Sequence, residues 1–233
     1  LRKEAIDLLA EWNGEMSIYL PQPLIFYSWA AQFQKMVMQD EIGKNVNWFN
    51  SVNSNFLERV LRNINGASAW CDIKQTSKLE TCEEISSKAL DNALVTIANK
   101  YGQDIKKWLW GNYHKAYFSD KVLGKYPIIS YLTNIVFEVS GGDDTLSMNR
   151  AISSTNNNYN VNYGSTLRII IDFSDNANNF FSIPTGQSGH FLSKHYDDFT
   201  NLWLRNEYVK IPLFEDEILN KKIDLMLITK SVD

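Results

Sequence analysis

His195, Asp197 and Asp198, near the end of the sequence, are residues of the types that general-base catalysis uses. An imidazole held by a carboxylate is the usual arrangement of a general base. The alternative is structural, because Ser193 favours the N-cap of a helix, and carboxylates in a first helical turn complement the helix dipole. His195 can also hydrogen-bond the backbone of such a turn. We therefore favour a structural role for these residues.

The tetrapeptide Gly186-Gln187-Ser188-Gly189 places a serine between two glycines. A nucleophile elbow requires Gly-x-Ser-x-Gly at a turn from strand to helix, whereas these glycines lie at positions −2 and +1 from the serine. The pattern does not match an elbow, so a free-standing serine hydrolase that uses Ser188 and His195 is the least favoured hypothesis. The two glycines instead predict a backbone with φ above zero, or one that passes close to another segment.

Two further candidates, His114 and Asp172, lie outside this region. His114 follows Trp108 and Trp110, so it is either a catalytic histidine in an aromatic pocket or a partly buried ring that pairs with a carbonyl group. We favour the second interpretation. Asp172 ends an apolar strand pattern, where a carboxylate is more often a solvated turn residue than part of a reaction centre.

Cys71 and Cys82 are the only cysteines, and they flank a short polar segment. Two cysteines that could close a short loop are typical of a disulfide formed in an oxidising compartment. Two reduced cysteines in a core are the alternative. No histidine lies near them in the sequence, and two thiolates alone lack the other ligands that zinc requires, so we expect no metal site here.

Helical periodicity dominates the first part of the sequence, and the alternation typical of strands dominates the later part. The predicted helices cover residues 1–12, 23–42, 48–61, 82–99 and 105–110. The later elements are strands at 135–140, 167–172, 179–183 and 223–229, an exposed asparagine-rich loop at 156–160, a helix starting at Ser193, an extended link at 208–212 and a short helix at 215–220. We therefore predict an α+β protein with a mainly helical part at 1–132 and a mainly β part at 133–233.

Composition limits the classes of partner. The 233 residues are enough for one large domain or two small ones, and 44% hydrophobic and 21% charged residues are ordinary for a globular protein. The net charge of −4, with scattered lysines and arginines, argues against a nucleic-acid partner. No stretch reaches the roughly 18 apolar residues that a membrane span needs. The sequence therefore predicts neither nucleic acid nor membrane as a partner.

Several unusual segments occur in the order in which one enzyme family has them. They are LLAEWNGEM at 8–16, WGNYHK at 110–115, GGDDT at 141–145, GSTLR at 164–168, GQSG at 186–189 and HYDD at 195–198. With these segments the sequence resembles the C-terminal part of the β-subunit in the penicillin acylase (penicillin amidase) family, a branch of the N-terminal-nucleophile hydrolases. The resemblance covers nearly the whole chain and is weakest between residues 43 and 79. It implies that the C-terminal strands belong to a layered αββα sandwich begun by earlier sequence.

The resemblance also implies where the chemistry lies. Family members use an N-terminal serine exposed by autoproteolysis, whose own α-amino group acts as base, whereas this chain begins at Leu1. The oxyanion-hole groups of the family likewise lie upstream of the LLAEWNG-like segment, so we expect no catalytic residue in this chain. Asp172 alone matches a strand carboxylate that cephalosporin-type relatives place near the reaction centre, although they use the longer glutamate. The motif residues with an implied structural role are Gly186, Gln187, Ser188, Gly189, His195, Tyr196 and Asp198.

The activity and partners of the intact protein are implied by the same resemblance. The expected reaction is hydrolysis of linear amide bonds, in the acyl side chains of β-lactams or in N-acyl homoserine lactones. The expected partners are the α-subunit and the N-terminal segment of the β-subunit, and unpaired strand edges favour self-association as well. We expect no cofactor in this chain, no activity of the chain alone, and a periplasmic or secreted location. The alternative is a non-catalytic binding or assembly remnant of a truncated acylase gene.

Overall fold

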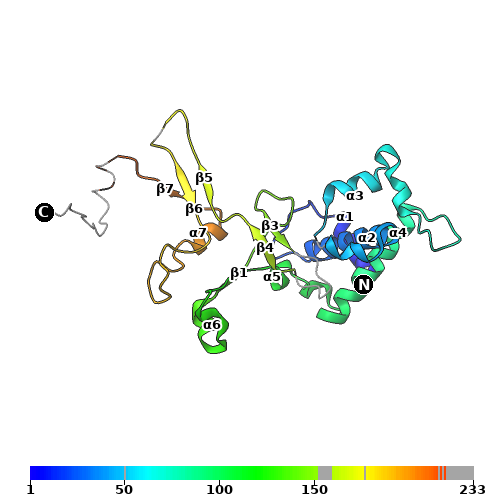
Figure 1. The fold of residues 1–233 in the computed structure, drawn as a ribbon, viewed down its shortest axis with the longest axis horizontal. Helices are drawn as coiled ribbons and strands as arrows, with labels where there is room; N and C mark the ends of the chain where they lie inside the picture. The colour runs from blue at the N-terminus through cyan, green and yellow to red at the C-terminus, as the bar shows by residue number, and fades with distance from the viewer. Residues whose placement is uncertain (50, 152–158, 176, 215, 217, 219–233) are drawn as a thin grey trace. The chain divides into compact units, whose positions relative to one another are not determined.

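The computed structural model of the chain describes residues 1–49, 51–151, 159–175, 177–214, 216 and 218. The backbone forms two compact units, Leu1–Ser165 and Thr166–Asp233. Mainly helical elements come first and small antiparallel sheets follow, which confirms the predicted α+β class (Figure 1). The boundary predicted between the helical part and the β part, at residues 132 and 133, falls between two strands of one sheet. These strands are β1 (Lys115–Phe118) and β2 (Ile135–Glu138), which pair with each other.

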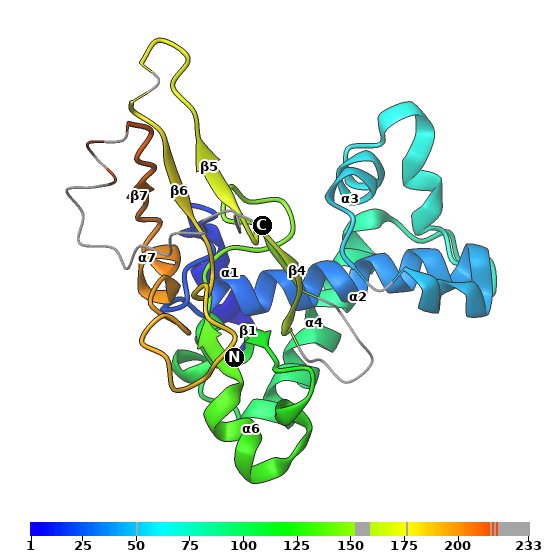
Figure 2. The same ribbon diagram turned by 60° about the vertical axis from the view of Figure 1, so that its left-hand side comes forward.

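The first unit begins with four α-helices: α1 (Arg2–Ala10), α2 (Gln22–Ile42), α3 (Ser54–Leu61) and α4 (Cys82–Tyr101). Helices α2 and α4 pack against each other (Figures 1 and 2). The start of α4 is fixed by a capping box, in which the Thr81 hydroxyl accepts from the Glu84 amide and the Glu84 carboxylate accepts from the Thr81 amide. Gly102 ends the helix with φ of 87°. The helices predicted at 1–12, 23–42 and 82–99 are confirmed, and local signals mark both ends of the third.

The helix predicted at 48–61 is confirmed only in its second half. A 3-10 helix, η1 (Gly43–Trp48), and the non-helical residues 51–53 precede α3. The Asn53 side chain accepts from the Phe56 amide at 2.9 Å, and the Asn53 amide donates to Gln34 Oε1 at 2.7 Å. The N-cap of α3 is therefore held by a side chain of α2, a tertiary contact that the periodicity of this segment does not encode.

The remaining helical segments are short. The helix predicted at 105–110 is two separate pieces, η3 (Ile105–Lys107) and α5 (Trp110–Tyr113). The others are η2 (Ile64–Cys71), η4 (Leu123–Lys125), α6 (Pro127–Thr133) and α7 (Thr200–Leu204).

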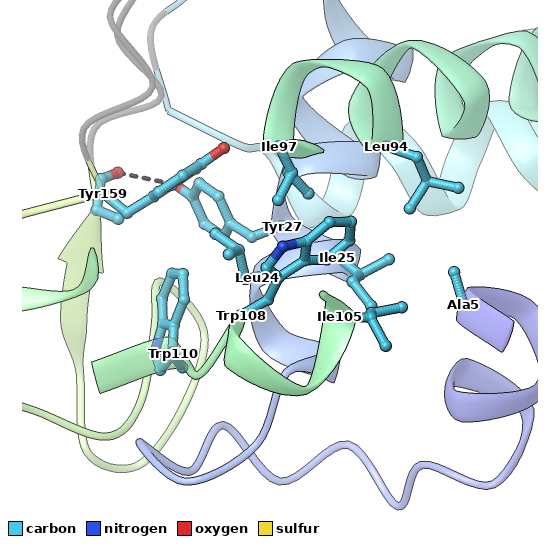
Figure 3. Packing of buried hydrophobic residues seen from close by; sticks show 11 residues of the cluster. Ala5, Leu24, Ile25, Tyr27, Leu94, Ile97, Ile105, Trp108, Trp110 and Tyr159 are labelled. Atoms are coloured by element: carbon cyan, nitrogen blue, oxygen red, sulfur yellow. Dashed lines mark hydrogen bonds between the residues drawn. The ribbon is translucent and has the colours of Figure 1, made fainter. Parts of the chain in front are cut away.

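Aromatic and aliphatic side chains from α2, α4 and the segment after Gly102 form the main core of the first unit (Figure 3). Trp108 and Trp110 are fully buried, and each indole N–H donates to a backbone carbonyl, at 2.8 Å to Gly102 and at 3.0 Å to Gly141. Both large rings are thus buried with their indole N–H groups hydrogen-bonded. The cluster contains Ala5, Leu24, Ile25, Tyr27, Leu94, Ile97, Ile105, Trp108, Trp110, Ala151 and Tyr159.

Cys71 and Cys82 form the expected disulfide. Cys71 is fully buried in a second apolar cluster. The loop that the disulfide closes is also held by Glu80, whose carboxylate accepts from the Thr76 hydroxyl at 2.8 Å and from the Ile73 amide at 3.1 Å. These hydrogen bonds, first that from Thr76, lower the pKa of Glu80.

Replacing both cysteines with alanine is expected to lower the free energy of unfolding by about 2 to 3 kcal/mol, because the cross-link restricts the unfolded chain over a short loop. Urea unfolding followed by far-UV circular dichroism measures the loss. Wild-type protein treated with dithiothreitol is the control and should lose the same amount. If reduction left the unfolding midpoint of the wild type unchanged, the disulfide would not contribute to stability.

Small antiparallel sheets follow the helices. In the first unit, β1 pairs with β2, and β3 (Asn149–Ala151) pairs with β4 (Val161–Gly164). In the second unit, β5 (Arg168–Ile170), β6 (Phe180–Ser182) and β7 (Val209–Lys210) form a sheet in that order. Arg168 faces Ser182 and Ile170 faces Phe180 across β5 and β6, so the predicted hairpin is confirmed.

Some predicted elements lie outside the described residues: the strand at 223–229, most of the helix at 215–220, and residues 156–158 of the asparagine-rich loop. Among the helices that the structure describes, none is long and apolar enough to cross a bilayer.

Candidate functional site

The GQSG and HYDD motifs meet through their backbones in the second unit. The Gly186 amide donates to the Tyr196 carbonyl at 2.8 Å, and the Ser188 amide donates to the His195 carbonyl at 2.9 Å. We call Gly186–Gly189 together with His195–Asp198 the clasp. Its two hydrogen bonds join segments on either side of the intervening turn at residues 190–194.

Gly186 is the residue that permits this approach. A Cβ atom at Gly186 would lie 1.9 Å from the carbonyl oxygen of His195 and 2.7 Å from the carbonyl carbon of Tyr196. The close passage predicted from the two glycines is therefore confirmed at Gly186. A Cβ at Gly189 would meet nothing within 4 Å, so the second glycine is not required by space.

The side chains of Ser188 and His195 have different hydrogen-bond partners in the part of the chain that the structure describes. The Ser188 hydroxyl accepts from the His190 amide at 3.1 Å. His195 Nδ1 lies 2.8 Å from Asp198 Oδ2, and the His195 side chain is 58% exposed. The structure thus forms the histidine–aspartate pair but brings only the backbone of Ser188 to His195.

The helix predicted to start at Ser193 is wrong. Residues 193–199 form turns, and α7 begins at Thr200. The Ser193 hydroxyl accepts from the His195 amide at 3.2 Å instead of capping a helix. In the clasp the carbonyls of His195 and Tyr196 accept from the amides of Ser188 and Gly186, instead of from amides one helical turn later.

Arg168 is a structural residue whose partners the sequence did not reveal. Its guanidinium lies 4.2 Å from the centre of the Trp203 ring and donates at 2.8 Å both to the Trp203 carbonyl and to Asn206 Oδ1. Stacking combined with charge-assisted hydrogen bonds is a geometry that arginine provides and lysine does not. Arg168 thereby ties β5 to the end of α7, and Thr200 ties the start of α7 to the Pro184 carbonyl at 2.9 Å.

Asp172 organises the turn between β5 and β6. Its carboxylate accepts from the Ser174 hydroxyl at 2.7 Å, the Ser174 amide at 2.9 Å and the Asn178 side chain at 3.2 Å. These hydrogen bonds, first that of the Ser174 hydroxyl, lower the pKa of Asp172 to about 2. All of these contacts are local to the turn, and a place near a reaction centre stays a prediction for Asp172.

His114 lies in the core of the first unit and not in a cleft. Its ring is fully buried and stacks on Trp110 at 4.3 Å between centroids. Nδ1 lies 2.6 Å from the Tyr159 carbonyl and therefore donates to it. Burial lowers the pKa of His114 to about 4, so the ring is neutral at physiological pH. The interpretation as a buried ring paired with a carbonyl is confirmed.

The sequence also did not indicate the contacts of a half-buried carboxylate, Asp143, in the GGDDT segment. Asp143 Oδ1 accepts from the Ala151 amide at 2.9 Å, and Asp143 Oδ2 lies 3.1 Å from the Tyr27 hydroxyl. Burial raises the pKa of Asp143 and, more strongly, that of Tyr27. The pair connects α2 to the β3 strand, because the Tyr27 hydroxyl also donates to the Ala151 carbonyl at 2.7 Å. In the described parts of the chain, no group of three or more His, Cys, Asp or Glu residues could hold a metal ion.

Comparison with known proteins identifies relatives along nearly the whole chain. The sequence profile named penicillin amidase matches residues 1–220. The acyl-homoserine lactone acylase QuiP of Pseudomonas syringae pv. tomato is 25% identical over 222 residues, which cover 91% of this chain and 26% of that protein. The protein of the same name from Pseudomonas aeruginosa is 21% identical over 238 residues, which cover 94% of this chain and 28% of that protein. The chain therefore spans about a quarter of the length of these curated relatives.

The fold agrees with these sequence matches. A thermostable penicillin G acylase from Alcaligenes faecalis has a TM-score of 0.56 to this chain at 19% identity, and the alignment covers 99% of this chain and 43% of that chain. At this identity the likeness shows a shared fold alone. Because the family profile extends over nearly all of the sequence and includes both motifs of the clasp, the chain belongs to the penicillin amidase family.

Proposed function

We propose that this chain is the C-terminal part of the β-subunit of a larger amide hydrolase, which cleaves linear amide bonds in the acyl side chains of β-lactams or in N-acyl homoserine lactones. Membership of the penicillin amidase family supports the reaction class. Two relatives named acyl-homoserine lactone acylases support the second substrate class. The chain spans only about a quarter of the length of these relatives, which supports the proposal that it is one part of a longer polypeptide. The other parts would be an α-subunit and the start of the β-subunit.

The clasp is the observation that carries a scaffold role for this chain. Its motif residues use backbone amides and carbonyls to hold two segments together. A serine nucleophile needs a base within hydrogen-bond reach, and the Ser188 hydroxyl pairs with the His190 amide rather than with the His195 ring. In this proposal a serine outside the chain, exposed when an inactive precursor is processed, attacks the amide carbonyl. The amine leaves, and water then releases the acyl group from the serine.

A periplasmic or secreted location is part of the same proposal. The Cys71–Cys82 disulfide supports it, because structural disulfides persist in oxidising compartments and are rare in the cytosol.

The test is hydrolysis of phenylacetyl-p-nitroanilide and of a long-chain N-acyl homoserine lactone by two proteins, the 233-residue chain and the longer polypeptide encoded by the same gene. The longer polypeptide should hydrolyse one of these substrates, and the chain alone should give no turnover above buffer. Turnover by the chain alone that is lost in Ser188→Ala or His195→Ala would contradict the scaffold role. A gene that encodes no upstream serine would instead favour the non-catalytic remnant.

A further inference from the structure

Large apolar side chains lie exposed in the connection between β1 and β2, which holds η4 and α6. Ile128, Tyr131 and Leu132 occupy positions i, i+3 and i+4 on one face of α6, and they are 85%, 89% and 62% exposed. Val122 and Tyr126, just before the helix, are exposed as well. We call these five residues the α6 patch. Figure 1 shows α6 beyond β1 and apart from α2 and α4.

Hydrogen bonds hold the α6 patch in a fixed frame. Asn134 Oδ1 accepts from the Asp120 amide at 3.0 Å, and Asn134 Nδ2 donates to the Gly124 carbonyl at 3.4 Å. The Asp120 carboxylate accepts from the amides of Val122 at 2.8 Å and Leu123 at 2.7 Å. A Cβ at Gly124 would lie 2.3 Å from Asn134 Oδ1, so the Asn134 contact needs glycine at this position. The exposed face is therefore presented by an ordered segment rather than a loose loop.

The arrangement of α6 is the reverse of an ordinary surface helix, which turns its apolar stripe toward the core. The α6 stripe faces outward, whereas the buried residue of the helix is polar Thr133, whose hydroxyl donates to the Ile129 carbonyl at 3.1 Å. Contiguous exposed apolar surface of this kind marks an interaction site. Lys121 and Lys125 directly precede the patch residues Val122 and Tyr126 in the sequence, and neither lysine belongs to an ion pair among the described residues. The surface thus fits an apolar partner face with acidic side chains at its edge.

We propose that the α6 patch packs against a segment of the same acylase polypeptide that lies outside this chain. This inference rests on the proposed function, because it takes its partner from the longer polypeptide. The chain covers only 26% of one relative and 43% of the structural neighbour, so most of the polypeptide in such proteins lies outside the matched region. A second copy fits less well, because a two-fold contact would bring Lys121 and Lys125 close to their own counterparts. A membrane surface also fits less well, since α6 is only seven residues long.

The experiment measures how fast a maleimide labels a thiol in the patch. Tyr131→Cys is made in the 233-residue chain and in the longer polypeptide, and labelling at this position is followed by peptide mass spectrometry. The native cysteines of the chain are both in the disulfide, so the new thiol is its only free one. Leu146→Cys is the control, because Leu146, directly after the GGDDT segment, is fully exposed and gives the rate of an open thiol in each sample.

We expect Tyr131→Cys to react at least about tenfold more slowly in the longer polypeptide than in the chain alone, because a covered thiol is inaccessible. Rates within about twofold of each other in the two proteins would overturn the inference. Protection of the chain alone that grows with its concentration, or that needs phosphatidylglycerol vesicles, would overturn the choice of partner.

Failure of this inference and failure of the proposed function are distinguishable in the same samples. Amide hydrolysis by a longer polypeptide whose Tyr131→Cys thiol labels rapidly would reject the α6 contact alone. Slow labelling in a longer polypeptide that hydrolyses no amide would reject the reaction and keep the contact. As an independent measurement, Ile128→Asp should leave the melting temperature of the chain unchanged and lower that of the longer polypeptide, while Leu146→Asp should change neither. An unchanged melting temperature of the longer polypeptide with Ile128→Asp would overturn the contact.

Discussion

Replacing Gly186 with alanine is expected to lower the free energy of unfolding of the second unit by about 3 to 4 kcal/mol, because the new methyl group would meet backbone atoms. The Cβ position lies 1.9 Å from the His195 carbonyl oxygen, so the two segments of the clasp have to separate. Separation breaks the hydrogen bonds of Gly186 to Tyr196 and of Ser188 to His195. Urea unfolding and amide hydrogen exchange at residues 186 and 188 measure both effects.

Gly189→Ala is the matched control, since it adds the same methyl group three residues away where nothing lies within 4 Å. It should change the free energy of unfolding by less than about 0.5 kcal/mol. If Gly186→Ala were as stable as Gly189→Ala, the clasp could not be the contact that holds this part of the chain.

Acidification is expected to destabilise the first unit by up to about 3 kcal/mol through His114 alone. Burial lowers the pKa of His114 from 6.5 to about 4, so the unfolded chain takes up a proton at a pH where the folded protein does not. The stabilising effect of the neutral buried ring is fully present above pH 6.5 and is lost as the pH falls from 6.5 to about 4. Urea unfolding at several pH values in this window, followed by far-UV circular dichroism, measures the slope.

His114→Asn supplies the comparison, because it keeps an N–H donor for the Tyr159 carbonyl but removes the titrating ring. The variant should be less stable at neutral pH. Between pH 6.5 and 4 its free energy of unfolding should depend less steeply on pH, by the slope that the uptake of one proton on unfolding produces. If the free energy of unfolding changed equally steeply with pH in the wild type and in His114→Asn, His114 would have to be protonated within the fold.

Local signals made much of the fold predictable. The helix α4 could be located because Thr81, Glu84 and Gly102 mark its ends with short-range chemistry. The β5–β6 hairpin could be predicted because its apolar runs and its turn are contiguous in sequence. Three predicted helices differ from the structure, and for two of them the contacts that replace the helical bonds come from outside the predicted helix. Gln34 fixes the start of α3, and the clasp takes the carbonyls that a helix from Ser193 would use.

The candidate site was predictable only in part, for the same reason. The spacing of Gly186 and Gly189 indicated a close backbone approach, yet the sequence could not say that His195 and Tyr196 supply the other side. The stacking of Arg168 on Trp203 joins residues 35 positions apart, and that pairing has no signature in either segment. Backbone contacts between motifs depend on the tertiary path of the chain, which residue types and periodicity do not specify.

The most direct test of this account is the processing and activity of the longer polypeptide that contains these 233 residues. N-terminal sequencing of its purified subunits, combined with assays on phenylacetyl-p-nitroanilide and an N-acyl homoserine lactone, examines the nucleophile and the reaction together. The account predicts a subunit that starts with serine, contains this chain at its C-terminal end, and loses amide hydrolysis when that serine becomes alanine. Hydrolysis that survives the loss of that serine but disappears in Ser188→Ala would contradict it.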